Sequence, residues 1–335
     1  MIEEEEENRP QERDLKVMAA MLFAVLALAF SSIFITYLER AQVPPIAIAF
    51  YRMAIATALL LPAALALRRR EMSLLTRREL ALLLLAGFCL AVHFGAYITS
   101  LKYIPIATSV VLVNSHPLFV VLASYVFLGE RPSRIHLIGT VTGLAGMLII
   151  GREGLKNVEL ALVGDALAIL GALSVVGYFI VGRKVRARIS LLGYVTPLYA
   201  VCSAFLLVWA VASGTRLYPY GPSEWLYFAA LAVVPTILGH TVFNWAIKHV
   251  RPSTISLAFL GEPVVASVLA FFFFDQSPPL STFVGGAVVL LGVYLTTAFG
   301  APAPPPRGAG LEAEPHAIIY TAGEGGRDGG REDGP

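Results

Sequence analysis

Two titratable side chains in this sequence stand directly before a proline, deep inside long apolar runs. Glu262 precedes Pro263, and His116 precedes Pro117. Proline removes a backbone N–H donor and interrupts helical hydrogen bonding, and an interruption of this kind is tolerated where backbone groups face a cavity. A carboxyl group at that depth suits proton binding or a cationic group of a ligand. The carboxyl group of Glu262 and the imidazole of His116 together suit a zwitterionic ligand. The alternative role for each side chain is a hydrogen bond to a neighbouring helix.

Two further pairs of polar residues have the spacing of one helix face. His93 and Tyr97 are four residues apart, and so are His240 and Asn244, so the members of each pair are expected on the same side of a helix. Polar groups inside a membrane are costly, which makes them candidates for binding a substrate or a coupling proton. A packing role is the alternative for both pairs.

Asn114 and Arg52 complete the set of candidates. Asn114 lies two residues before His116 and is expected to point in another direction. Arg52 lies a few residues inside the outer end of its apolar run. A cation there can attract an anionic substrate or extend to the interface, and the structural role is favoured. No local cluster offers three ligands for a metal ion, so neither a metal nor another cofactor is expected.

The composition indicates an integral membrane protein. Of the 335 residues, 57% are hydrophobic and only 14% are charged, whereas soluble domains average about 45–50% and about 25%. The two cysteines, Cys89 and Cys202, both lie inside apolar runs and predict no disulfide framework. The charges are distributed along the chain by side of the membrane and do not indicate a nucleic-acid partner.

The apolar runs are long enough to predict the number of membrane spans. A bilayer core about 30 Å thick is crossed by about 20 mostly apolar helical residues. The connections between the runs are short and leave no room for a soluble catalytic domain. The sequence therefore predicts an all-α membrane protein with ten transmembrane helices, at about 17–38, 43–67, 80–101, 106–128, 135–151, 160–182, 190–213, 225–247, 253–274 and 280–299.

The two halves of the chain repeat each other at a constant offset of 146 residues. This offset pairs Pro117 with Pro263 and His116 with Glu262. Each half contains five predicted helices, an odd number, so the second half enters the membrane in the opposite orientation. Inverted repeats of this kind favour alternating access to a site between the halves.

The segments outside the repeats are predicted to be disordered tails. An acidic run, Glu3–Glu7, marks an N-terminal tail over residues 1–15, and a Pro- and Gly-rich segment marks a C-terminal tail over residues 301–335. Such compositions cannot bury a core. The two five-helix repeats then cover residues 16–151 and 160–300.

The distribution of Lys and Arg predicts the orientation. With the N-terminus inside, 19 of the 25 basic residues fall in inner segments and 5 in outer loops, with Arg52 inside a helix. Basic residues concentrate on the cytoplasmic side, so both termini are expected in the cytoplasm. Short loops and the lack of a sorting signal favour the plasma or inner membrane of a prokaryote.

Several short motifs together resemble the EamA family of the drug/metabolite transporter superfamily. They are the sequence FYR at 50–52, FLGE at 127–130 after Pro117, GEP at 261–263 and the glycine-bearing run VGGAVVLLGVYL at 284–295. The second half has Asp275 and Gln276 where the family often repeats the glycine–glutamate pair.

The resemblance implies ten helices in two inverted repeats and the movement of small metabolites, often amino acids, across a cell membrane. It also implies a central path between the halves, lined mainly by the first, third and fourth helices of each. An exporter is favoured, with protons as possible coupling ions. The alternatives left open are another cargo, such as a nucleotide sugar or a drug-like cation, and a membrane scaffold or receptor that transports nothing.

The sequence disfavours an enzyme and leaves a homodimer as an alternative. An intramembrane protease is disfavoured, because the chain has no nucleophile motif, no HExxH site and no pair of facing aspartates. Glycines stud two of the predicted helices, at 139, 143, 285, 286 and 292, and small residues allow helices to approach closely. Packing inside one chain is favoured for them, and a homodimer seam is the alternative.

Overall fold

The computed structural model describes residues 2–104, 109, 112–129, 131–151, 161–275 and 280–299. These residues form helices and short connections, and no strand occurs among them. The described residues belong to one compact unit. The predicted C-terminal tail, and Glu130 and Gln276 of the motifs above, lie outside the described residues.

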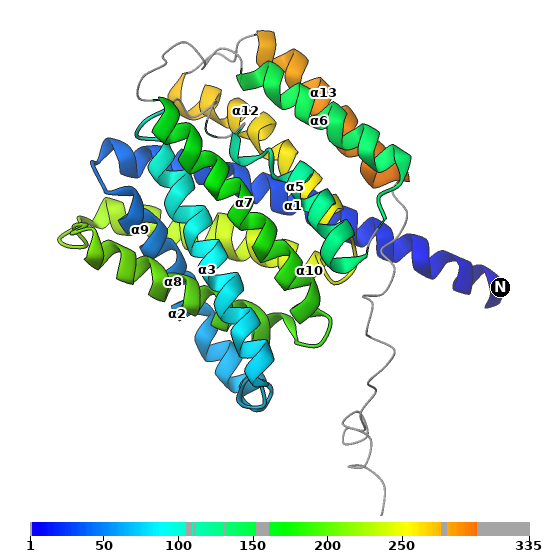
Figure 1. The fold of residues 1–335 in the computed structure, drawn as a ribbon, viewed down its shortest axis with the longest axis horizontal. Coiled ribbons are helices and arrows are strands. Elements are labelled where there is room, and N and C mark those ends of the chain that lie inside the picture. Colours follow the sequence, from blue (N-terminus) through cyan, green and yellow to red (C-terminus); the bar gives the residue numbers. More distant parts are fainter. Residues whose placement is uncertain are drawn as a thin grey trace, which may run out of the picture. The chain divides into compact units, whose positions relative to one another are not determined.

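The helices follow the apolar runs of the sequence (Figure 1). The first half contains α1 (Ile2–Arg40), α2 (Pro45–Ser73), α3 (Arg77–Ser100), α5 (His116–Ala123), the π-helical η1 (Ser124–Leu128) and α6 (Arg134–Gly151). The second half contains α7 (Ala161–Arg186), α8 (Leu191–Ala212), α9 (Pro222–Leu231), the π-helical η3 (Ala232–His240), α10 (Thr241–Ala246), α11 (Pro252–Ala258), the 3₁₀ turn η4 (Phe259–Gly261), α12 (Glu262–Phe274) and α13 (Leu280–Phe299).

Seven helical stretches within the described residues are long and apolar enough to cross a membrane. They are Leu15–Arg40, Pro45–Ser73, Arg77–Ser100, Leu162–Arg186, Leu191–Ala212, Pro222–Ala246 and Pro252–Phe274. The other three predicted spans, 106–128, 135–151 and 280–299, contain α5–η1, α6 and α13. Residues 106–108, 110 and 111 of the first of them lie outside the described residues. The prediction of membrane-spanning helices is confirmed for the seven, and the full set of ten stays a prediction.

The start of α1 differs from the sequence-based expectation. The helix begins at Ile2, whereas its membrane-capable part begins at Leu15. The acidic residues before Leu15 therefore continue the same helix in the structure, where the sequence predicted a disordered segment. The assignment of residues 1–15 to a tail outside the membrane stays a prediction.

Local sequence signals start several of these helices. Pro45, Pro222 and Pro252 each occupy the first turn of a helix, where the missing N–H costs nothing. Thr76 caps α3 because its hydroxyl accepts from the Glu79 backbone N–H at 3.2 Å. The Glu79 carboxylate in turn accepts from the Thr76 N–H at 2.9 Å, which completes a capping box.

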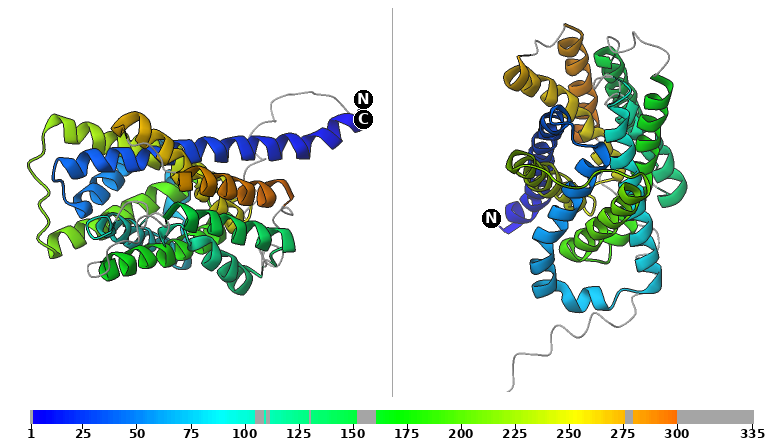
Figure 2. Two further views of the ribbon diagram at one scale, coloured as in Figure 1. Left: turned by 90° about the horizontal axis from the view of Figure 1, so that it is seen from above. Right: turned by 90° about the vertical axis from the view of Figure 1, so that its left-hand side faces the viewer.

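The glycine-bearing helices α6 and α13 lie side by side, as both views of the bundle show (Figure 2). A Cβ atom on Gly146 would lie 2.5 Å from the Gly285 carbonyl oxygen, and one on Gly292 would lie 2.5 Å from the Gly143 nitrogen. The backbones are therefore in direct contact, as small residues permit. The glycines serve packing inside one chain, the interpretation favoured from the sequence.

Candidate substrate cavity

Seven of the eight candidate residues line one internal cavity. It is enclosed by residues of α1, α2, α3, α7, η3, η4 and α12 and by the segment that precedes and begins α5. The lining consists of the candidates Arg52, His93, Tyr97, Asn114, His116, His240 and Glu262, together with Leu28, Ser31, Phe94, Val113, Val175 and Phe259.

The cavity is small in this conformation. Its volume is about 30 Å³, and one water molecule needs about 10–15 Å³. Pockets that hold organic ligands measure about 300–1,000 Å³. The structure is therefore a closed state, in which the polar side chains have gathered around a space for two or three waters.

Arg52 is the cation of this cavity and is only 1% exposed. Its Nε donates to the Thr236 hydroxyl at 2.7 Å, and its Nη1 donates to the Ser31 hydroxyl at 3.1 Å. Its guanidinium carbon lies 4.4 Å from the centre of the Phe94 ring, a cation–π distance. Three helical elements, α1, α3 and η3, thus hold the guanidinium in place.

Pro235 leaves the Leu231 carbonyl, four residues earlier, free to accept from the Thr236 hydroxyl. A proline has no N–H to donate, and the helix around it widens into the π-helical segment η3, a form that is frequent at functional sites. The Thr236 hydroxyl donates to the Leu231 carbonyl at 2.8 Å. Because its single proton is used there, the hydroxyl meets Arg52 as an acceptor.

Glu262 lines the same cavity as Arg52. It is the first residue of α12, directly after the 3₁₀ turn η4, so the break predicted at Pro263 is where the carboxylate enters the cavity. Glu262 is the acidic group that interacts with Arg52 through space. Within the described part of the chain no ion pair or hydrogen bond joins the two side chains.

Three histidines surround these two charges. His93 contacts the Gly171 carbonyl through Nδ1 at 3.0 Å, so Nδ1 carries the proton and links α3 to α7. His116 lies 3.4 Å from the Ser256 hydroxyl. His240 packs edge-on against Phe94, and its buried Nδ1 has no hydrogen-bond partner among the described residues.

The two asparagines differ from their sequence-based expectations. Asn114 was expected to point away from His116, but both line the cavity, because helical structure is interrupted by a turn at residues 114 and 115. Asn244 does not line the cavity. Its side-chain amide donates to the His240 carbonyl at 2.9 Å, so a bond within its own helix replaces the expected contact with the path.

Several residues that line the cavity or hold Arg52 were not identified from the sequence. Ser31 and Thr236 hold Arg52, and Phe94 and Phe259 supply aromatic walls. A hydroxyl directly after an intrahelical proline was the available signal for Thr236. Serines and phenylalanines are common in apolar helices, so Ser31 and the two rings carried no distinguishing signal.

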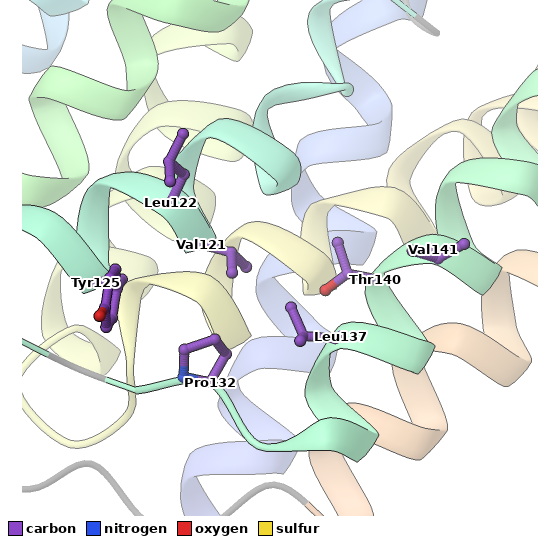
Figure 3. A pocket seen from close by; sticks show the side chains of 7 residues that line it. All are labelled: Val121, Leu122, Tyr125, Pro132, Leu137, Thr140 and Val141. Atoms are coloured by element: carbon purple, nitrogen blue, oxygen red, sulfur yellow. The ribbon is translucent and has the colours of Figure 1, made fainter.

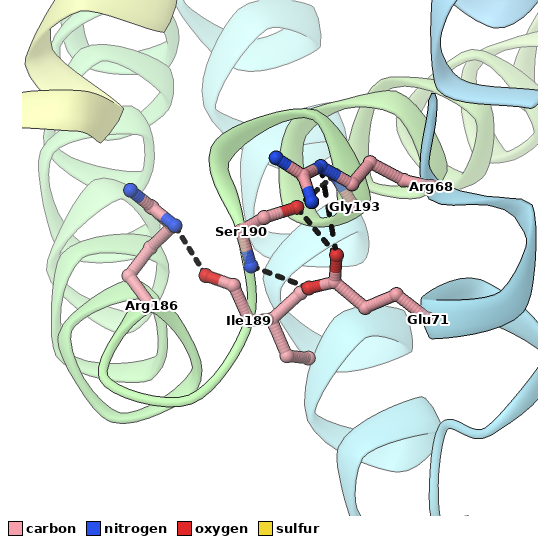
Figure 4. A network of polar contacts seen from close by, with 6 residues as sticks. All are labelled: Arg68, Glu71, Arg186, Ile189, Ser190 and Gly193. Carbon is pink, nitrogen blue, oxygen red and sulfur yellow. Dashed lines mark hydrogen bonds and ion pairs between the residues drawn. The ribbon is translucent and has the colours of Figure 1, made fainter. Parts of the chain in front are cut away.

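A second polar network ties helix ends together away from the cavity (Figure 4). The Glu71 carboxylate at the end of α2 accepts from the Ser190 backbone N–H at 2.5 Å and from its hydroxyl at 2.7 Å. Arg186 of α7 donates to the Asn244 carbonyl at 3.0 Å and to that of Ile189. The distribution of basic residues predicts that this end of the bundle is cytoplasmic.

A larger groove lies on the outside of the bundle, between α5–η1 and α6 (Figure 3). It measures about 300 Å³ and is lined by Val121, Leu122, Tyr125, Pro132, Leu137, Thr140 and Val141. Leu122 and Val141 are each 62% exposed, as expected for side chains that face lipid. The groove carries no charged group, so it does not suit a polar solute.

Comparison with known proteins finds similarity in both halves of the chain. The pattern of the EamA-like transporter family matches residues 15–152 and 162–298, one match in each half of the chain. A solved crystal structure with 20% sequence identity aligns with a TM-score of 0.72 over 85% of this chain and 98% of that chain. At this identity the likeness describes the fold alone.

Three curated relatives are similar over most of the chain. An uncharacterized transporter of Archaeoglobus fulgidus is 25% identical over 84% of this chain and 98% of its own. The pseudopaline exporter CntI of Pseudomonas aeruginosa is 26% identical over 82% and 94%. A probable terminal-alkyne amino-acid exporter of Streptantibioticus cattleyicolor is 27% identical over 65% and 73%.

Proposed function

Because the chain belongs to the EamA-like transporter family, we propose that it exports small polar metabolites, with amino acids or related compounds as the substrate class. The transporter has ten transmembrane helices in two inverted repeats and works by alternating access. Both termini lie in the cytoplasm. The substrate binds in the cavity between the repeats, near the middle of the membrane.

The observation that carries this proposal is the charge arrangement of the cavity. Arg52 and Glu262 lie on its wall without a direct bond between them. A zwitterion supplies one group of each sign and can satisfy both. Polar residues inside a membrane are costly and mark substrate or ion pathways, and here they converge from distant parts of the sequence.

Alternating access is supported by the repeat and by the closed cavity. His116 and Glu262 are repeat equivalents, and each begins a helix directly before a proline. Interrupted helices at equivalent positions of two halves are typical of transporter binding sites. A cavity of about 30 Å³ admits an organic solute only after one half moves relative to the other.

Proton coupling is assigned to Glu262, with His116 as a second candidate. A carboxyl group in the membrane interior can bind a proton during the transport cycle. Export is supported by the two relatives whose printed names describe exporters. Another cargo, namely a nucleotide sugar or a drug-like cation, is the second candidate, favoured only if amino acids are not exchanged.

The first test is counterflow in reconstituted vesicles. Labelled amino acids are measured with and without a pH gradient, and nucleotide sugars and drug-like cations are measured alongside. We expect exchange of at least one amino acid, with a rate that depends on the gradient. Glu262→Gln removes the acid with little change of shape and should abolish the gradient dependence.

Glu224→Gln is the matched control. Glu224 lies in the first turn of α9, is partly exposed and does not line the cavity, so the same chemical change there should leave transport unaltered. Full, gradient-dependent transport by Glu262→Gln would remove Glu262 from the mechanism. Folded wild-type protein that exchanges none of the tested solutes would count against the transport of these classes.

A further inference from the structure

We propose that Arg52 binds the carboxylate of the transported solute, so that the cargo carries a free carboxylate in every case. This assignment rests on the proposed function and narrows its substrate class to amino carboxylates. It excludes amines without an acid group and neutral sugars.

The contacts of Arg52 position its guanidinium for a ligand. Two of its three nitrogen atoms are held by the hydroxyls of Thr236 and Ser31, and its flat face lies on Phe94. These contacts fix the plane of the guanidinium. A planar donor group fixed in this way recognises a carboxylate by geometry as well as by charge.

The third nitrogen of the guanidinium is left for a ligand. Nη2 of Arg52 is buried and has no hydrogen-bond partner among the described residues. Leaving a buried charged donor unsatisfied is costly, and an orphaned buried donor calls for an explanation. A substrate oxygen at this nitrogen supplies the missing acceptor, and Arg52 itself lines the cavity.

The number of fixed positive charges in the cavity limits the negative charge that a solute can carry. Arg52 is the only Lys or Arg among the described lining residues. One fixed cation matches one carboxylate, whereas a diphosphate would leave excess negative charge in a region of low dielectric. The Thr236 hydroxyl spends its proton on the Leu231 carbonyl and cannot donate to an anion. The Ser31 hydroxyl accepts from Arg52 and keeps its proton, so it adds a neutral donor for the same carboxylate but no second positive charge.

The positions of Arg52 and Glu262 determine how the solute is oriented. Glu262 lies on the same cavity wall without a bond to Arg52, so the carboxylate binds at Arg52 and the ammonium group lies toward Glu262. The side chain of the solute then lies among Leu28, Val175 and Phe259. The site therefore selects strongly for solutes that carry a carboxylate and only weakly among solutes whose apolar side chains differ in shape.

The test compares acids with their amides. The melting temperature of the purified full-length protein is measured in detergent with a mixture of the standard amino acids, and again with a mixture of their amides. The amides keep the ammonium group and lose the anion. We expect the acids to stabilise the wild type at concentrations at least about tenfold lower than the amides require. This is the difference in affinity that the loss of one charged hydrogen bond produces.

Arg52→Gln should remove this preference, and Arg52→Lys should weaken it, because an ammonium group cannot reproduce the planar fork. Arg188→Gln, a change at an exposed arginine outside the cavity, is the matched control and should behave as the wild type. If the Arg52 variants fail to fold, the comparison of acids and amides on the wild type still decides. Equal stabilisation by both mixtures, or by neither, would overturn the proposal.

Counterflow separates this proposal from the transport function. Transport of amines or sugars by the wild type, unchanged in Arg52→Gln, would support a transporter and refute the carboxylate site. Arg52-dependent binding of amino acids without any counterflow would support the carboxylate site and refute transport of these solutes.

Discussion

At the scale of single residues, the environment decides whether a buried polar side chain contacts a cavity residue or serves only the packing of the helices. Thr236 and Asn244 are both buried and lie eight residues apart. The Thr236 hydroxyl accepts from the cation of the cavity. The Asn244 amide donates to the His240 carbonyl and interacts with Tyr178 and Tyr199, so it stabilises the packing of α10.

Asn244→Ala tests this distinction. Removal of a buried amide that satisfies neighbouring polar groups costs about 1–3 kcal/mol, so the melting temperature of the purified variant should fall. The concentration of solute that gives half-maximal counterflow should stay within about twofold of the wild type. A loss of affinity for the solute by tenfold or more, in protein of unchanged stability, would show that Asn244 belongs to the substrate site.

The sequence could predict the charged members of the cavity but not the groups that hold them. Arg52 and Glu262 stood out because ionised side chains inside apolar runs are rare and costly. Ser31 did not stand out, because hydroxyl residues in membrane helices are common and usually bond a carbonyl of their own helix, as Thr57 does with Met53. Which hydroxyl meets the arginine depends on how the helices pack.

At the scale of helices, proline positions were predictable and their consequences were less so. The prolines of the GEP motif and its equivalent mark the starts of α12 and α5, as expected from the removed N–H. The π-helical segments η1 and η3 were not expected, because the hydrogen-bond register of a helix is not visible in the spacing of apolar residues. The register of η3 brings Thr236 to Arg52 and His240 to the cavity.

Gly292→Val tests the contact between α6 and α13. The Cβ of the new side chain would lie 2.5 Å from the Gly143 nitrogen and 2.6 Å from the Gly139 carbonyl oxygen, and backbone atoms in a packed helix pair cannot yield easily. We expect a loss of folded, monodisperse protein by size-exclusion chromatography, since overpacking of this kind costs at least about 1–3 kcal/mol.

Gly171→Ala is the control for this substitution. A Cβ there would lie 3.5 Å from the nearest atom, an ordinary contact, so the variant should elute and melt as the wild type does. A Gly292→Val protein of normal yield and melting temperature would show that the two helices separate freely, contrary to the packing described.

At the scale of the whole molecule, the sequence predicted a repeated membrane bundle, and the structure adds that its polar centre is closed. The repeat was visible because prolines and glycines recur at one offset along the chain. The closure was not visible, because cavity volume depends on the packing of side chains from eight different segments. A bundle closed around about 30 Å³ transports an organic solute only by changing its shape.

Val175→Cys tests this change of shape in a chain whose two native cysteines are replaced by serine. Val175 lines the cavity and is only 1% exposed, so a thiol there reacts with a water-soluble maleimide only when the cavity opens. Alternating access predicts labelling in right-side-out and in inside-out vesicles, at rates that change when solute is added. Labelling from one side alone would contradict it.

Leu206→Cys in the same background is the control for this experiment. Leu206 is fully buried in α8 and does not line the cavity, so the thiol introduced there should stay unlabelled from both sides. If the Leu206→Cys variant reacts as fast as the Val175→Cys variant, the reagent enters by general loosening of the bundle, and no access cycle follows from the labelling. If only the Val175→Cys variant reacts, and from both sides, the cavity opens alternately to each side of the membrane, and the closed state is one stage of the transport cycle.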